Sequence, residues 1–181
     1  MTIQHRICDY LSREHVPFTI EHSPDEAFLP GCPAKGDWRD APLVRVVPLF
    51  VDRQLAMLVI RAGLPVDRGA IVRAFPGRQV EPVDRAVVSI AFPDSDADCL
   101  PPFGVFWRMP VYIDDALNNE PLIRFHAGSP NDIVTLRRED FDRLSQPICV
   151  HVARTANLPT PELARTASRV EARLAESASR S

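Results

Sequence analysis

The sequence predicts an α+β fold with a mixed, largely antiparallel β-sheet. Two apolar runs, 43–51 and 54–63, flank Asp52 and Arg53, and this arrangement is typical of a hairpin. Segments with helical spacing lie between segments that alternate as strands. Helices and strands are therefore interspersed while hairpin-like neighbours dominate, which defines the class.

The first half of the chain begins with a helix and a strand. Ile3, Ile7 and Leu11 recur at helical spacing behind a capping Thr2, so residues 2–14 are predicted to form an amphipathic helix. Residues 17–22 alternate as a short strand. Residues 23–42 are rich in proline, glycine and aspartate, and a loop of that length is usually functional or disordered.

The hairpin and the two helices after it carry local signals of their own. Pro48 places the first hairpin strand at a sheet edge or a bulge. The second strand is apolar enough to be buried on both faces. Segments 65–75 and 82–92 each begin Pro-Val-Asp and continue at helical spacing, so two short helices are expected.

The second half predicts a long strand over 103–114 and further strands over 122–128, 132–140 and 148–153, with a short helix over 140–146. After Ala153 the composition shifts, and Thr160 and Pro161 mark the start of a possible terminal helix. We therefore expect one domain over 1–153 and a helical or partly disordered tail over 154–181.

Composition excludes several classes of protein. The 181 residues carry a formal net charge of −3, so general binding to DNA or RNA through phosphates is not expected, and any nucleic acid must be recognised at a small local site. No apolar stretch approaches the roughly 20 residues of a membrane span. The first residues do not form a secretion signal, and the four cysteines have no CxxC spacing. These features predict a cytoplasmic protein.

Common catalytic motifs do not occur in the chain. There is no GxSxG elbow, Walker loop or GxGxxG turn, and the five histidines have no metal-ligand spacing. We expect no cofactor and no metal. The one unusual stretch is the Pro-Pro-Phe-Gly segment that enters an apolar strand. It is either an ordinary turn or a loop held rigid because it touches a ligand.

The order of four motifs resembles the YbaK-type family of aminoacyl-tRNA deacylases. This family includes the ProX proteins and the editing domain inserted in bacterial prolyl-tRNA synthetases. The motifs are Pro-Pro-Phe-Gly at 101–104, Val-Tyr-Ile-Asp at 111–114, Ala-Gly-Ser at 127–129 and an acidic-Asp-Phe helix at 139–141. The resemblance covers residues 1 to about 153, is strongest from 92 to 147, and implies a barrel-like sheet flanked by helices.

The resemblance also implies an activity and partners. Family members remove a wrongly attached small amino acid from the 3′ end of tRNA without a metal. A bound water, aided by the terminal ribose hydroxyl, attacks the ester carbonyl. The protein supplies a shaped pocket, backbone dipoles and a lysine near the terminal phosphate. The implied partner is the acceptor end of mischarged tRNA, with an aminoacyl-tRNA synthetase as a second possibility.

Carried over residue by residue, the resemblance names a site. Arg45 occupies the position of the lysine and is assigned the catalytic role. Residues 98–104, here called the proline loop, form the pocket, while His22 and the loop after it cover the pocket and His126 contacts the aminoacyl group. The expected substrate-binding residues are His22, Asp98, Cys99, Leu100, Pro101, Pro102, Phe103, Gly104, His126, Gly128 and Ser129.

Two positions depart from the family pattern. Asp98 stands where the GxxxP loop has glycine, which permits a positive φ or a close approach to substrate. Arginine at position 45 can hold a phosphate in bidentate fashion but cannot transfer a proton. Arg45 is alternatively a surface charge, and Lys35 is a second candidate cation. The functions left open are a trans-editing deacylase, a degenerate module that binds without hydrolysis, and an accessory module docked on a synthetase through the tail.

Overall fold

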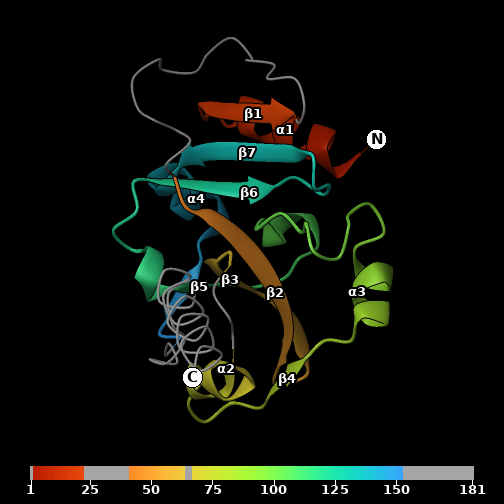
Figure 1. Ribbon diagram of the computed structural model, residues 1–181, viewed down its shortest axis with the longest axis vertical. Helices are drawn as coiled ribbons and strands as arrows, with labels where there is room; N and C mark the ends of the chain where they lie inside the picture. The colour runs from red at the N-terminus through yellow and green to blue at the C-terminus, as the bar shows by residue number, and fades with distance from the viewer. Residues whose placement is uncertain (1, 23–40, 64–66, 153–181) are drawn as a thin grey trace, which may run out of the picture.

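The computed structural model describes residues 2–22, 41–63 and 67–152. In this part of the chain eight strands form one mixed sheet with the order β1-β7-β6-β2-β3-β5-β8, and β4 pairs with β2 (Figure 1). The sheet is open rather than closed into a barrel, and the predicted α+β class is confirmed. The strands are β1 Phe18–His22, β2 Leu43–Val51, β3 Gln54–Arg61, β4 Val80–Pro82, β5 Val111–Asp114, β6 Leu122–His126, β7 Asp132–Arg137 and β8 Ile148–Val150.

Four α-helices accompany the described sheet. They are α1 Ile3–Arg13, α2 Arg68–Arg73, α3 Arg85–Ala91 and α4 Arg138–Ser145, with short 3₁₀ turns η2 Gly104–Phe106 and η3 Asp115–Leu117. The predicted cap of α1 is confirmed, because the Thr2 hydroxyl accepts the His5 amide. Among the helices of the described ranges, none combines the length and the apolar character needed to cross a bilayer.

The two faces of the sheet bury separate hydrophobic cores. On β2, Val44 and Val46 belong to the first core, whereas Leu49 and Val51 belong to the second. The first core also holds apolar side chains from α1, α4 and the segment 92–107, and the second holds those of α2. Neighbouring residues of a strand point to opposite faces of the sheet. A residue next to a core-facing side chain on these strands therefore points to the other face.

The predicted hairpin is confirmed as β2 and β3, joined by Asp52 and Arg53 with φ values of 50° and 68°. Residues 56–60 of β3 are all buried, as expected for a strand covered on both faces. The strand β2 pairs with β6 at 43–44 and with β4 at 49–51, so its edge carries no ladder between them. Pro48 lies in this gap, where its missing N–H leaves no strand partner unsatisfied.

The predicted long strand over 103–114 is wrong. Only Val111–Asp114 forms a strand, while residues 104–106 form the turn η2. Arg108 has a φ of 55° and Pro110 has no backbone N–H, so neither suits a continuous ladder. The short strand β4 was not predicted. The expected loop over 23–42 falls mostly, and the expected terminal helix entirely, outside the described residues, and the domain boundary at Ala153 stays a prediction.

Candidate active site

The proline loop is part of the first core. Residues 99–104 are buried without interruption. The ring of Phe103 is fully buried and makes edge-on contacts with four aromatic rings, at centroid distances from 5.5 Å for Phe125 to 6.3 Å for Phe106. Leu100 packs in the same core. The rigid entrance to β5 is therefore explained first by packing, since these apolar side chains are held by the protein itself.

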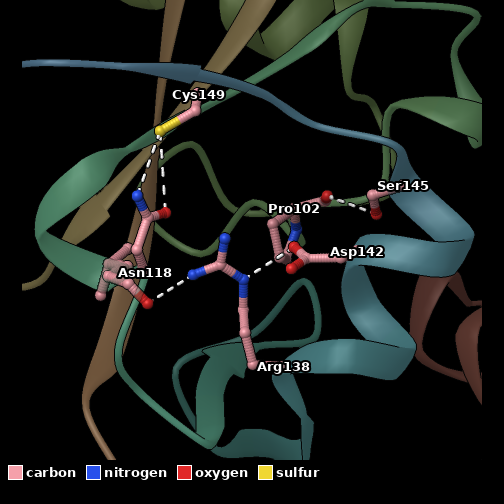
Figure 2. A network of polar contacts seen from close by, with 7 residues as sticks. Pro102, Asn118, Arg138, Asp142, Ser145 and Cys149 are labelled. Carbon is pink, nitrogen blue, oxygen red and sulfur yellow. Dashed lines mark hydrogen bonds and ion pairs between the residues drawn. The ribbon is translucent and has the colours of Figure 1, made fainter.

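Helix α4 is hydrogen-bonded to the proline loop. The Ser145 hydroxyl donates to the carbonyl of Pro102 at 3.4 Å. The helix is fixed in turn by Arg138, whose buried guanidinium donates to the Leu117 carbonyl and, at 2.7 Å, to Asp142. Figure 2 shows Arg138 joining the turn around Asn118 to α4 beside Pro102. This network limits movement of the loop, as a positioning role requires.

Backbone hydrogen bonds join the start of the proline loop, and the residues just before it, to the turn that follows β6. The Gly128 amide donates to the Cys99 carbonyl, and the Asp96 amide donates to the Gly128 carbonyl, both at 2.9 Å. The Gly128 φ of 94° and a hypothetical Cβ only 2.1 Å from Ile3 Cγ2 require glycine there. The structure thus brings together two segments that the sequence assigned to one site, the proline loop and the Ala127–Ser129 turn.

We expect Gly128→Ala to destabilise the protein by more than the roughly 1–2 kcal/mol that a left-handed backbone costs a non-glycine residue. The added methyl group must also displace the side chain of Ile3. The control is Gly77→Ala, because Gly77 has a φ of 76° but open space around its Cβ position. Urea unfolding measures both variants, and equal losses of free energy would show that the close packing at Gly128 is unimportant.

Ser129 acts as a turn residue. Its hydroxyl donates to Asp132 Oδ2 at 2.6 Å and accepts the Asn131 amide at 3.3 Å. The other Asp132 oxygen accepts from Gln4 of α1 at 3.2 Å. His22, at the end of β1, lies opposite Asp132 in the β1–β7 ladder. The Ser129 hydroxyl therefore stabilises the turn between β6 and β7.

His126 ends β6 on the face opposite the first core, because Ile123 and Phe125 of the same strand belong to that core. Its Nδ1 is buried and has no hydrogen-bond partner among the described residues. Burial lowers the pKa of the imidazole, a hydrogen bond with the Ser129 backbone opposes this, and the nearby charge of Arg124 lowers the pKa further. The ring is therefore neutral at pH 7.

Arg45 is exposed on β2 and shares this second face, because Val44 and Val46 beside it point into the first core. In the parallel β2–β6 ladder Leu43 lies beside Arg124, and the ladder ends at Val44 and Phe125. Arg45 and His126 are thus the next residues on this face, where the two strands part. The side chains of the proline loop pack on the other face, so Arg45 and these side chains lie on opposite faces of the sheet.

The same face carries polar residues that were not predicted. Arg124 makes an ion pair with Glu21 at 2.7 Å across β7, and their side chains are only 17% and 31% exposed. The hydroxyls of Thr19 and Thr135 are buried without a hydrogen-bond partner among the described residues. Alternation in the segment 122–126 already placed Arg124 on the face of His126, and this signal could have identified it.

Asp98 points to the surface. Its carboxylate forms an ion pair with Arg85 of α3 at 2.9 Å, and both side chains are about three-quarters exposed. Asp98 is not among the described residues with positive φ, so its backbone does not need glycine. Burial and the charges of Asp96 and Asp98 raise the pKa of Cys99, which keeps this thiol protonated and excludes a nucleophilic thiolate.

The site therefore combines a rigid backbone junction at the end of β6 with a neutral imidazole and a cation on the neighbouring strand. The described residues contain no group of three or more histidine, cysteine or carboxylate side chains arranged to hold a metal. An arrangement of fixed polar groups and one exposed cation is suited to holding a phosphorylated substrate by position and charge.

The profile of the aminoacyl-tRNA editing domain matches residues 42–144, more than half of the chain, and the chain belongs to this family. No match is found among curated proteins. The fold is similar to the crystal structure of a proposed trans-editing enzyme for prolyl-tRNA synthetase, with 14% identity, a TM-score of 0.62, and coverage of 84% of this chain and 97% of that one. The identification predicted from the four motifs is confirmed.

Two other solved structures have the same fold. One is a hypothetical protein with 9% identity and a TM-score of 0.63, for which coverage is 81% of this chain and 97% of that chain. The other is a proposed signal transduction protein from Marinobacter aquaeolei VT8, with 14% identity and a TM-score of 0.62. The match covers 92% of this chain but 35% of that protein, so the fold also occurs within a longer chain.

Proposed function

We propose that the chain is a trans-editing deacylase that removes a wrongly attached small amino acid from the 3′ end of tRNA. Family membership supports an editing role. The observation that carries the proposal is the junction of Cys99 and Gly128, which lies at the end of β6 where β6 parts from the strand of Arg45. A rigid backbone and an exposed cation at one strand end suit an acceptor end with its terminal phosphate.

The reaction is hydrolysis of an ester. The oxygen of a water molecule bonds to the ester carbonyl carbon, the bond from that carbon to the ribose oxygen breaks, and the ribose oxygen takes a proton. Arg45 binds the terminal phosphate and transfers no proton, because its guanidinium keeps its protons and stays charged. The rigid junction positions the aminoacyl ester, and the neutral imidazole of His126 contacts the aminoacyl group.

His126 should titrate below the ordinary histidine pKa of about 6.5. Because the folded protein disfavours the imidazolium, the unfolded chain binds the proton first as the pH falls. Proton binding by His126 therefore lowers the free energy of unfolding as the pH falls from above 6.5 towards the lower pKa of the folded state. NMR titration of the ring gives the midpoint, and His126→Gln should remove this part of the pH dependence. A midpoint at or above 6.5 would contradict the neutral-imidazole assignment.

A panel of mischarged tRNAs tests the activity. The purified chain should release one small amino acid faster than spontaneous hydrolysis and leave correctly charged tRNAs intact. A flat profile over the whole panel would refute the proposal.

The second candidate is a degenerate member of the family that binds a tRNA end, another ligand or a synthetase without hydrolysis. Arg45 at the lysine position and the ion pair of Asp98 with Arg85 favour this alternative. It predicts that Arg45→Lys combined with Asp98→Gly creates a deacylase activity that the parent chain lacks. Activity in the unmodified chain would eliminate this candidate.

A further inference from the structure

A groove beside the β2–β3 turn is separate from the candidate active site. It has a volume of about 280 Å³ and is lined by Phe50, Arg53, Gln79 and Glu81. None of these residues belongs to the proline loop, to the Ala127–Ser129 turn or to the face that carries His126. The lining combines an aromatic ring, a cation, an amide and a carboxylate, which is a set of groups that can recognise a nucleobase.

The walls of the groove are held in place by hydrogen bonds. Asp52 accepts the Gln79 amide at 2.9 Å through its side chain and donates its own amide to the Gln79 carbonyl at 2.8 Å. Arg78 donates to Asp52 at 2.7 Å and to the Tyr112 hydroxyl at 2.7 Å. The hairpin turn, the segment before β4 and β5 are thereby joined, so the groove is preformed.

The groove opens on the face of the sheet that carries the proline loop. Phe50 lies opposite Glu81 in the β2–β4 ladder and opposite Leu55 in the β2–β3 ladder. Leu55 packs against the first core, to which the proline loop also contributes. Phe50 follows Arg45 by five residues on the same strand, or about 17 Å at the usual rise, and the two side chains project from opposite faces of the sheet. Single-stranded RNA that contacts both residues passes around the edge of β2 between the β6 and β4 ladders, a path that a few nucleotides can span.

We propose that this groove binds one unstacked nucleobase of the single-stranded acceptor end of tRNA. The ring of Phe50 stacks on the base and Arg53 binds the adjoining phosphate. Glu81 accepts a hydrogen bond from an exocyclic amino group, and Gln79 reads the same edge. The groove therefore takes cytosine, adenine or guanine in preference to uracil. The inference rests on the proposed function, because it assigns a second contact to the same tRNA.

Other ligand classes fit the lining less well. A free phosphate would pair with Arg53 but would leave the ring of Phe50 and the carboxylate of Glu81 without a complementary group. An apolar ligand would leave three polar side chains out of four without partners. A nucleotide satisfies each group, since its base has an apolar face and a polar edge and its phosphate is anionic.

Binding of two oligoribonucleotides to the full chain tests the groove without any deacylation. Tetracytidylate should bind at least about tenfold more tightly than tetrauridylate, and Phe50→Ala should weaken binding of tetracytidylate by about tenfold. Glu81→Gln should reduce the preference for cytosine, and Arg53→Ala should reduce the salt dependence of binding.

Phe50→Leu keeps apolar volume without the aromatic ring and should lose binding while the urea midpoint stays close to that of the parent. Arg137→Ala, a remote exposed arginine, is the charge control.

Equal affinities for the two oligonucleotides, or unchanged binding by Phe50→Leu, would overturn the assignment. The outcome is independent of the deacylase test. If the chain prefers tetracytidylate through Phe50 but hydrolyses no member of the panel, base binding in the groove is supported and the proposed hydrolysis is refuted. If the chain is active but has no base preference, only base binding in the groove is refuted.

Discussion

Arg45→Ala should lower kcat/KM for deacylation of mischarged tRNA by roughly 10- to 100-fold. A charge-assisted contact to a phosphate is worth about 1.5–3 kcal/mol, and each 1.4 kcal/mol corresponds to about a factor of ten. Arg45→Lys should keep most of the activity, because a lysine can also anchor a phosphate as a point charge. Steady-state kinetics on the tRNA that the panel identifies measures both variants.

A surface arginine elsewhere provides the comparison for Arg45. Arg73 on α2 is 63% exposed and forms an ion pair with Asp67 at 3.7 Å. Arg73→Ala therefore removes one positive charge at a position outside the candidate site. We expect its kcat/KM to equal that of the parent. If Arg45→Ala also retains full activity, Arg45 is an ordinary surface charge and its assignment as phosphate anchor is wrong.

Phe103→Ala should destabilise the fold by about 3–5 kcal/mol, a large share of the usual 5–15 kcal/mol for a domain. Phe103 is fully buried, and its removal leaves a cavity among the rings of Tyr10, Phe125 and Phe141. The backbone of the proline loop then loses its main anchor in the core. Urea unfolding followed by fluorescence or circular dichroism gives the free-energy change.

Val105→Ala is the matched control for Phe103→Ala. Val105 lies two residues further along the same segment but is 52% exposed, so its truncation should change stability by no more than about 0.5 kcal/mol. A loss of less than about 1 kcal/mol in Phe103→Ala, together with abolished activity, would contradict the packing role. It would place Phe103 against the substrate instead.

Local signals predicted most of the elements because local chemistry determines them. The hairpin follows from two apolar runs around Asp52 and Arg53, and both residues adopt the left-handed conformation that a tight turn needs. Pro48 marked an edge position, and the structure places it in the gap between the β6 and β4 ladders. Thr2 is predictable as a cap because a short side-chain acceptor can bond to the first turn of a helix, and its hydroxyl accepts the His5 amide.

Features that depend on long-range packing were missed. The segment 103–114 has the composition of a strand, but Arg108 and Pro110 interrupt it, and residues 103–104 are occupied by core contacts. The ion pair of Arg124 with Glu21 joins residues far apart in sequence, so no local pattern shows it. The resemblance assigned the proline loop and the Ala127–Ser129 turn to one site, and the structure joins these two segments by a hydrogen bond from Gly128 to Cys99. It could not show that Arg45 faces away from the loop's side chains, because that depends on the alternation of the folded strand.

The proposed hydrolysis of mischarged tRNA takes place at the junction of Cys99 and Gly128, with Arg45 as the phosphate anchor. The most direct measurement is the rate of release of labelled amino acid from each tRNA of the panel, with the parent chain and Arg45→Ala compared at equal concentration. We expect rapid release of one small amino acid by the parent and a rate at least tenfold lower for the variant. Release at the spontaneous rate with both proteins, for every tRNA tested, would contradict it.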